Sequence, residues 1–420
     1  MIVTLEESAR ELLSKRFDVC ICGSGPAGMS LGLKLASLKR NVLLLEAGDT
    51  SFSEESQKVY QGTNIGLDYF PPDVSRLRFF GGTSNHWGGW CRPLGEHDFE
   101  TRDHVKYSGW PITKSDIDPY LTEAKQILDV QERKPSPDYL AINGREDNLE
   151  KVEFGFSSPT PTHFGEKFGD RIKSSENITC VMNANLVDVV LKSGFGEVDS
   201  FVVENYSGQT FNVTAKRYVL CLGGIENARM LLNANKQVET GIGNENDLVG
   251  RYFMEHPTNT VADFLINHEN PKVQSIVKGD DISRSFYAPS KEYLDTNKLV
   301  NFCARFVPNG QIKKGSLTFK ERLAKIMCTS DTVYAVVKEF KDKLWCYDGE
   351  VRISSEQSPN PSSRIKLGNS TDRFGNKRIE IDWQLSPIDK KTIQQATIEI
   401  GKLMAAKDIG RIRVRDWVFD

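Results

Sequence analysis

Residues 17–49 read FDVCICGSGPAGMSLGLKLASLKRNVLLLEAGD, and this stretch decides the fold. An apolar run of strand length ends at GSGPAG (23–28), and apolar residues at helical spacing follow it. A second apolar run, Val42–Leu45, ends at Glu46. The order predicts a strand, a glycine-rich turn, a helix and a second strand, which is the arrangement that binds dinucleotides in α/β folds.

The three glycines of this turn have separate predicted roles. Gly23 permits the tight turn, Gly25 lets the backbone approach a pyrophosphate, and Gly28 lets helix and strand pack closely. The helix N-terminus offers free N–H groups and a positive dipole end to phosphates. Glu46 lies near the spacing at which an acid accepts hydrogen bonds from an adenosine ribose. A chance glycine turn is the alternative, and the pattern alone does not distinguish FAD from NAD.

Length and composition limit the class of protein. The chain has 420 residues, enough for two or three domains. Hydrophobic residues make up 39% and charged residues 26%, as in an ordinary globular protein. The net charge of -3 gives no basic surplus that would attract nucleic acid or an anionic membrane.

The cysteines and the first residues bear on the compartment. Eight cysteines are scattered without a CxxC pair, so a metal site or a redox dithiol has little support. A reduced, cytoplasmic location is the simpler expectation. Residues 1–16 lack the apolar core of a signal peptide and are expected to form an amphipathic helix. No stretch reaches the apolar length of a membrane span, so none is expected.

Residues 76–94, RLRFFGGTSNHWGGWCRPL, combine four glycines with several aromatic side chains and one histidine. Glycine at that density is costly in a helix, so the run is expected to be irregular. Aromatic residues among glycines suit a loop that encloses a flat ligand. A glycine-rich hairpin with aromatic packing is the alternative.

The rest of the chain divides into two parts. Residues 1–257, with a helical and loop insertion at about 95–180, are expected to form a Rossmann-like nucleotide-binding domain. Residues 258–420 are expected to form a β-rich domain of antiparallel sheet plus helices, so the fold class is α/β with a second domain. The strand before Gly223-Gly224 is expected to be the next crossover of the first sheet rather than a second phosphate site. Other expected elements are a helix at 116–128, strands at 181–191 and 217–222, a helix at 225–233, a hairpin of 364–367 with 378–383, a helix at 387–406 and a strand at 411–414.

Taken in order, the motifs resemble the glucose-methanol-choline (GMC) flavoprotein oxidoreductases. The matching stretches are GSGPAG with Glu46, RFFGGTSNHWGG, GWPITKSDIDPYL, LCLGGIENARMLL, LVGRYFMEHP, EQSPNPSSRIKL and IDWQLSPID. The histidine in GGTSNHW makes the branch of pyranose oxidases and sugar dehydrogenases the most similar. The resemblance favours FAD over NAD.

The resemblance also implies roles for particular residues. The FAD contacts would come from Gly23, Gly25, Pro26, Ala27, Gly28, Glu46, Ala47, Gly82, Thr83, Ser84, Asn85, His86, Leu186, Val187 and Gly223. The segment 82–86 would lie along the isoalloxazine edge, and the backbone of Leu186 and Val187 would cover the adenine. His86 is similar to a histidine that bonds covalently to the flavin in pyranose oxidases. A histidine that only contacts the flavin is the alternative, because Asn85 replaces the threonine often found there.

The implied reaction is oxidation of the CH–OH group of an alcohol or sugar, with hydride transfer to flavin N5 and oxygen or another acceptor taking the electrons. The family's base is a histidine in an HxxGT-like motif near the C-terminus. This chain has no histidine after His268, so no catalytic residue is assigned and the C-terminal completion of the FAD domain is expected to be absent. Impaired turnover would follow.

Two other functions remain open. The chain could be a catalytically silent flavin-binding or interaction protein that keeps the fold without the base. A nicotinamide-dependent dehydrogenase is disfavoured, because the aromatic, histidine-bearing glycine loop has no evident use in one. The sequence identifies neither the substrate, nor the electron acceptor, nor the oligomeric state.

Overall fold

A five-stranded parallel sheet organises the N-terminal part of the computed structural model. The structure describes residues 1–6, 15–131, 138, 140, 148–267, 269–270, 286–308 and 348–420. The strand order is β1 (Ile2–Thr4), β9 (Ile178–Met182), β3 (Val42–Leu45), β2 (Phe17–Cys22) and β13 (Ala215–Leu220). All four pairings are parallel, as expected when helical crossovers join the strands.

Both faces of this sheet are covered. Helices α2 (Pro26–Ser37) and α7 (Phe164–Ser174) pack on one face around a core that includes Ile21, Met29 and Phe168. The other face packs against an antiparallel sheet of β10 (Asn185–Leu191), β11 (Val198–Glu204) and β12 (Thr210–Val213). Burial on both faces explains why β3 is apolar throughout and why Asp18 is the one charged residue of β2.

Two expected elements differ from the structure. Residues 181–191 were expected to form one strand, but the chain turns at Asn183, whose φ is 59°. Asparagine tolerates this left-handed conformation, so β9 ends and β10 begins in another sheet. The helix expected for residues 1–16 is wrong at Ile2–Thr4, where β-branched side chains form the edge strand β1. Residues 7–14 lie outside the described part.

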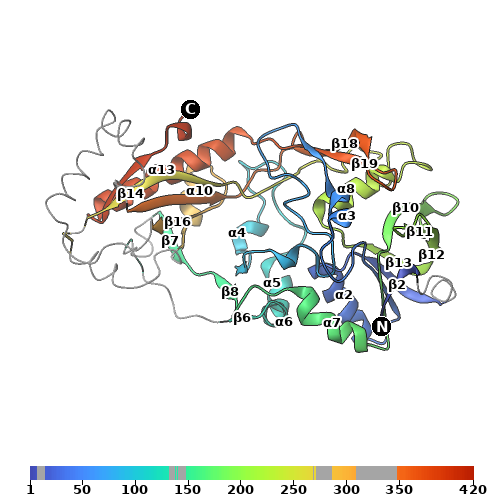
Figure 1. Ribbon diagram of the computed structural model, residues 1–420. Helices are drawn as coiled ribbons and strands as arrows, with labels where there is room; N and C mark the ends of the chain where they lie inside the picture. Colours follow the sequence, from blue (N-terminus) through green and yellow to red (C-terminus); the bar gives the residue numbers. More distant parts are fainter. Residues whose placement is uncertain are drawn as a thin grey trace.

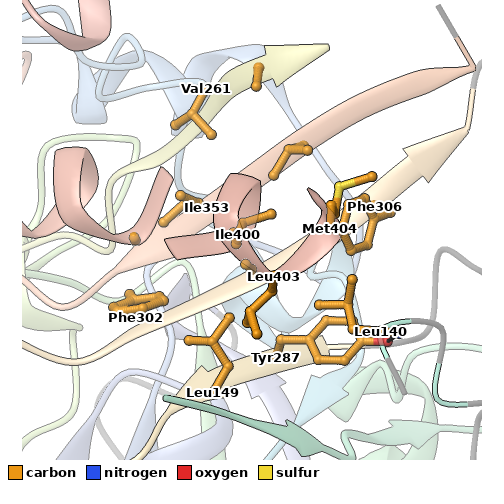
Figure 2. Close-up of a cluster of buried hydrophobic side chains, with 14 of the residues drawn as sticks. Leu140, Leu149, Val261, Tyr287, Phe302, Phe306, Ile353, Ile400, Leu403 and Met404 are labelled. Atoms are coloured by element: carbon orange, nitrogen blue, oxygen red, sulfur yellow. Dashed lines mark hydrogen bonds between the residues drawn. The ribbon is translucent and has the colours of Figure 1, made fainter. Parts of the chain in front are cut away.

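A six-stranded antiparallel sheet organises the second part, at the opposite end of the molecule from α2 and α7 (Figure 1). Its strand order is β20 (Gly410–Val414), β14 (Thr258–Ile266), β17 (Gly349–Ser355), β16 (Phe302–Pro308), β15 (Phe286–Pro289) and β7 (Leu149–Val152). Helix α13 (Pro387–Ala406) covers one face. Figure 2 shows Ile400, Leu403 and Met404 of α13 packed against Phe306 and Ile353 of the sheet.

Helix α13 has the bounds that its sequence predicts. Pro387 occupies the first helical position, and the Asp389 carboxylate accepts a hydrogen bond from the backbone N–H of Ser386 at 2.7 Å. Ile393, Ala396 and Ile400 recur at helical spacing and are buried. The expected last strand is also confirmed as β20, paired antiparallel with β14.

The two parts of the chain are interwoven. The hairpin of β18 (Arg364–Thr371) and β19 (Lys377–Asp382) pairs with β4 (Thr63–Asn64) and contacts α8 (Gly224–Asn233), while β7 comes from the insertion and joins the second sheet. A division at residue 257 therefore remains a proposal. The remaining elements are α3 (Glu54–Gln57), η1 (Lys58–Tyr60), η2 (Gly82–Asn85), β5 (Trp90–Cys91), α4 (Glu96–Phe99), α5 (Lys114–Ile117), η3 (Asp118–Tyr120), α6 (Leu121–Ile127), β6 (Val130–Gln131), β8 (Gly155–Ser157), α10 (Lys291–Asn297) and η7 (Asp416–Val418).

The other expected elements are found close to their predicted bounds. The helix expected at 116–128 occurs as α5, η3 and α6 in succession, and the strand before Gly223 is β13 of the first sheet, as the crossover interpretation requires. Two sequence patterns typical of turns, Asn-Gly at 309–310 and Lys-Gly at 314–315, lie outside the described residues, as does His268. Among the helices that the structure describes, none combines the length and the hydropathy that crossing a bilayer requires.

Candidate functional site

The glycine turn after β2 folds tightly because two of its glycines have no room for a side chain. Gly23 has φ 104°, and a Cβ there would lie 2.4 Å from the carbonyl oxygen of Cys221. A Cβ on Gly28 would lie 1.9 Å from the carbonyl oxygen of Gly23. A Cβ on Gly25 would meet no atom within 4 Å. The turn therefore closes around Gly23 and Gly28 and leaves open space at Gly25.

That open space belongs to a cavity of about 930 Å³ where β2, β3 and β13 end. The carboxyl ends of parallel strands are where open α/β sheets bind ligands. The N-termini of α2 and α8 both meet the cavity, and a Cβ on Gly223, the residue before α8, would also meet no atom within 4 Å. Predicted site residues that line the cavity are Gly23, Gly25, Pro26, Ala27, Glu46, Ala47, Gly82, Thr83, Leu186 and Gly223.

Glu46 lies at the end of β3 with its carboxylate buried in the cavity wall. One oxygen accepts hydrogen bonds from the backbone N–H and the hydroxyl of Ser24, and the other accepts from the backbone N–H of Gly48 at 2.8 Å. A carboxylate has about four acceptor sites, so one remains for a ligand hydroxyl. The three donors hold the side chain in this orientation.

Residues 76–94, the glycine-aromatic run, lie over the glycine turn 23–28 and form a loop rather than a hairpin. The backbone N–H of Gly81 donates to the Ser24 hydroxyl at 3.2 Å, and η2 follows directly. The hydroxyl of Ser84 donates to the carbonyl of Gly81, and the amide of Asn85 donates to the carbonyl of Gly82. Ser84 and Asn85 thus hold the loop together and do not line the cavity.

Three other predicted residues also lie outside the cavity lining. Gly28 is behind the turn, and His86 is exposed beyond η2. Val187 lies at an irregularity of β10, where the pairing with β11 skips from Leu186 to Asp188. Its carbonyl accepts a hydrogen bond from the Asn376 amide at 3.1 Å. The structure thus brings ten predicted residues to the cavity and places five around it.

Arg78 is a site residue that the sequence analysis missed. Its guanidinium is buried at the cavity and donates to the Ser56 hydroxyl at 3.1 Å, the Tyr206 hydroxyl at 3.0 Å and the Asn185 side-chain oxygen at 2.8 Å. All three partners are neutral, whereas buried charges are ordinarily paired. The cavity side of this guanidinium therefore suits an anion. The sequence signal was the RLR tripeptide that precedes the aromatic residues.

A second charged group closes the cavity wall. Glu226 at the start of α8 contacts Arg76 at 3.0 Å and Arg229 at 2.6 Å, and Arg229 also pairs with Asp372 of the β18–β19 turn. Burial would raise the pKa of Glu226, but Arg229 and Arg76 hold it below its ordinary value. Burial, followed by the charge of Glu226, raises the pKa of Tyr60 to about 12. The four side chains Arg76, Glu226, Arg229 and Asp372 thus form a buried ionic group of two positive and two negative charges.

Tyr69 connects the segment 61–75 to Glu255 in the cavity wall. Its hydroxyl donates to Oε1 of Glu255 at 2.6 Å, and its ring packs edge-on against Phe253 and Trp383, with centroids 5.5 and 5.9 Å away. Burial and the Glu255 carboxylate raise the pKa of Tyr69, so the phenol keeps its proton. Both Tyr69 and Glu255 line the cavity.

Replacing Tyr69 with phenylalanine should loosen this segment without unfolding the chain. The rings keep their contacts, but the hydrogen bond to a carboxylate is lost, which costs about 1.5–3 kcal/mol. We expect limited proteolysis within residues 61–75 to accelerate several-fold. Tyr120→Phe, at an exposed tyrosine, is the control and should cleave at the unchanged rate. Equal rates for Tyr69→Phe and the control would contradict the role given to this bond.

None of the described histidines lines the cavity. The Nε2 atom of His104 contacts the carbonyl oxygen of Leu299 at 2.9 Å, and His163 lies 3.4 Å from Glu166. The side chain of His256 is 80% exposed beside Glu255. These contacts fit structural or surface roles for His104, His163 and His256.

Solved structures of two oxidases share this fold. Formate oxidase of Aspergillus oryzae RIB40 matches with a TM-score of 0.56 at 15% identity, over 96% of this chain and 84% of that chain. Pyridoxine 4-oxidase of Mesorbium loti matches with a TM-score of 0.53 at 14% identity, over 96% and 83%. The chain shares the fold of these two oxidases, which confirms the predicted fold class and agrees with the resemblance to GMC flavoprotein oxidoreductases.

Among curated proteins, the fructose dehydrogenase large subunit of Gluconobacter japonicus is 24% identical over 323 residues. The match covers 57% of this chain and 58% of that protein, so the chain spans less than two thirds of its relative's length. No family model matches the chain.

Proposed function

We propose that the chain binds FAD in the 930 Å³ cavity and oxidises the CH–OH group of a small alcohol or sugar. The observation that carries FAD binding is the open space at Gly25 and Gly223, before two helix N-termini and beside a buried guanidinium with neutral partners. Helix N-termini and a cation together bind a pyrophosphate. The remaining acceptor site on Glu46 suits a ribose hydroxyl.

Bound flavin would supply the two-electron acceptor for the carbinol C–H bond. The chain's own part is positioning. Gly82 and Thr83, held over the turn by the Gly81–Ser24 hydrogen bond, would flank the ring. The exposed imidazole of His86 would either bond covalently to the flavin or contact it. Two matched proteins are named for the hydroxylated compounds fructose and pyridoxine, which supports an alcohol or sugar as substrate.

A catalytically silent flavin-binding protein is the second candidate. It is supported by the lack of a histidine in the cavity lining among the described residues. Oxygen or another acceptor would take the electrons only if the first function holds. Both candidates require the same cofactor and differ in whether a substrate reduces it.

The test is FAD titration followed by anaerobic mixing with a panel of alcohols and sugars. We expect one FAD per chain, and bleaching of the flavin absorbance by at least one compound. Glu46→Ala should weaken FAD binding about tenfold or more, since it removes an acceptor for the ribose. Glu239→Ala, at an exposed glutamate, is the control.

Each outcome has a separate meaning. A colourless protein that takes up no FAD would overturn both candidates. If FAD binds but no compound bleaches it, the oxidoreductase is overturned and the catalytically silent flavin-binding protein is supported. Acid precipitation after loading tests His86. A yellow pellet indicates the covalent bond, and His86→Ala should then release all the flavin to the supernatant.

A further inference from the structure

The face of the six-stranded sheet that α13 does not cover carries a row of residues in register. Phe286 pairs with Arg305, Arg305 pairs with Arg352, and Arg352 pairs with Thr260. Directly paired residues project to the same face, so two arginines stand side by side. We name Arg92, Arg305, Arg352, Phe286 and Thr260 the arginine face.

Among the described residues, only one of the two paired arginines forms an ion pair with a carboxylate. The side chain of Arg352 donates to Glu350 at 3.1 Å, and Glu350 also accepts from Thr260 at 3.2 Å. Arg305 makes no ion pair within the described chain and lies 6.0 Å from the centroid of the Phe286 ring. Like charges directly opposite each other destabilise a sheet, so Arg305 beside Arg352 lowers the stability of the fold when no anion is bound.

A third cation approaches the same place from the glycine-aromatic run. Arg92 follows β5, and its guanidinium lies 6.0 Å from the Phe154 ring. The Phe154 and Phe286 rings lie 4.4 Å apart, so Arg92 and Arg305 contact the same aromatic pair. Glu350 also lies 3.7 Å from Arg415, so its single charge is already shared between Arg352 and Arg415.

The arginine face also adjoins the loop proposed to flank the flavin. Trp90, in β5, packs edge-on against Phe286 with centroids 5.2 Å apart. Trp90 follows His86 by only four residues. One segment therefore connects the proposed flavin site to the row of arginines.

We propose that the arginine face binds an oxyanion of the substrate, so that the substrate is a hydroxylated compound bearing a carboxylate or a phosphate. Guanidinium groups bind both anions by paired N–H donors. Trp90 and Phe286 would cover the carbon skeleton. An anion here would compensate Arg305, which forms no ion pair with the residues that the structure describes. This inference rests on the proposed function, because it concerns the substrate of the same site.

The test compares D-gluconate, glucose 6-phosphate and uncharged D-glucitol by calorimetric titration of the FAD-loaded full-length chain. We expect gluconate or glucose 6-phosphate to bind at least tenfold more tightly than glucitol, and added salt to weaken that preference. Whichever of the two anions binds more tightly identifies the carboxylate or the phosphate as the bound group. Arg305→Gln should abolish the preference, and Arg305→Lys should keep part of it.

Arg411→Gln, at an exposed arginine of β20 in the same sheet, is the control and should keep the full preference. Equal affinity for all three compounds, or an unchanged preference in Arg305→Gln, would overturn the inference. FAD content is measured first on the same samples. Failure to load FAD counts against the proposed function, whereas loaded protein without anion preference counts only against the arginine face.

Discussion

Gly28→Ala is expected to destroy the nucleotide site, because the new Cβ would lie 1.9 Å from the carbonyl oxygen of Gly23. The obstructing atom is backbone, so no rotation of a side chain relieves the clash. Overpacking in cores ordinarily costs about 1–3 kcal/mol, and we expect this substitution to exceed that range. The measurements are thermal unfolding and FAD titration, with the variant showing a lower Tm and no saturable FAD binding.

Gly32→Ala is the matched control in the same helix. A Cβ there would lie 3.7 Å from Cδ1 of Ile21 and 3.8 Å from Cγ1 of Val42, which is ordinary contact. Alanine in a helix interior is favoured over glycine by about 0.5–1 kcal/mol, so this variant should be as stable as the parent or slightly more. If Gly28→Ala and Gly32→Ala behaved alike, the close approach at the turn would be disproved.

Arg229→Met should be the most destabilising substitution among the charged residues. The Arg229 side chain is 3% exposed and pairs with two carboxylates, Glu226 and Asp372, which are 7% and 1% exposed. Removing one member of a buried ionic group costs about 3–5 kcal/mol, because the remaining charges stay buried without compensation. Denaturant unfolding measures the loss directly. Arg217→Met, at an exposed arginine whose side chain bonds only a backbone carbonyl, should change little.

The free energy of unfolding measured as a function of pH in the acid range gives a second test of Arg229→Met. The pKa of Glu226 is lowered in the folded chain, with burial opposing and Arg229 and Arg76 prevailing. Its stabilising contribution is therefore present above the ordinary value of 4.5 and is lost as the pH falls through the folded pKa. Arg229→Met should flatten this loss below pH 4.5. An unchanged pH dependence in the acid range would mean that Arg229 does not hold the Glu226 charge.

Local signals in the sequence were sufficient for several elements. Strand β2, the glycine turn and α2 follow from an apolar run, glycine spacing and apolar residues at helical spacing, all within residues 17–37. Helix α13 follows from its capping residues and its apolar spacing. In such segments the local preference and the tertiary contacts agree, so a single sequence predicts them.

Elsewhere, contacts between distant residues decide the structure. Arg78 is buried because Asn185 and Tyr206 meet it from more than a hundred residues away. Ser84 and Asn85 face the loop instead of the cavity because the loop's own carbonyls accept their hydrogen bonds. The break at Asn183 depends on the left-handed conformation of one residue within the strand-like run 181–191. Periodicity does not encode any of these.

The pairing of β13 with β2 has a consequence for synthesis on the ribosome. About 190 residues separate the two strands. At a synthesis rate of about 5–20 residues per second, β13 is therefore made about 10–40 s after β2. During that interval the nascent chain presents an apolar strand edge of the kind that associates with other chains. Chaperone supply and growth temperature during expression should therefore influence the yield of this protein more than its final stability does.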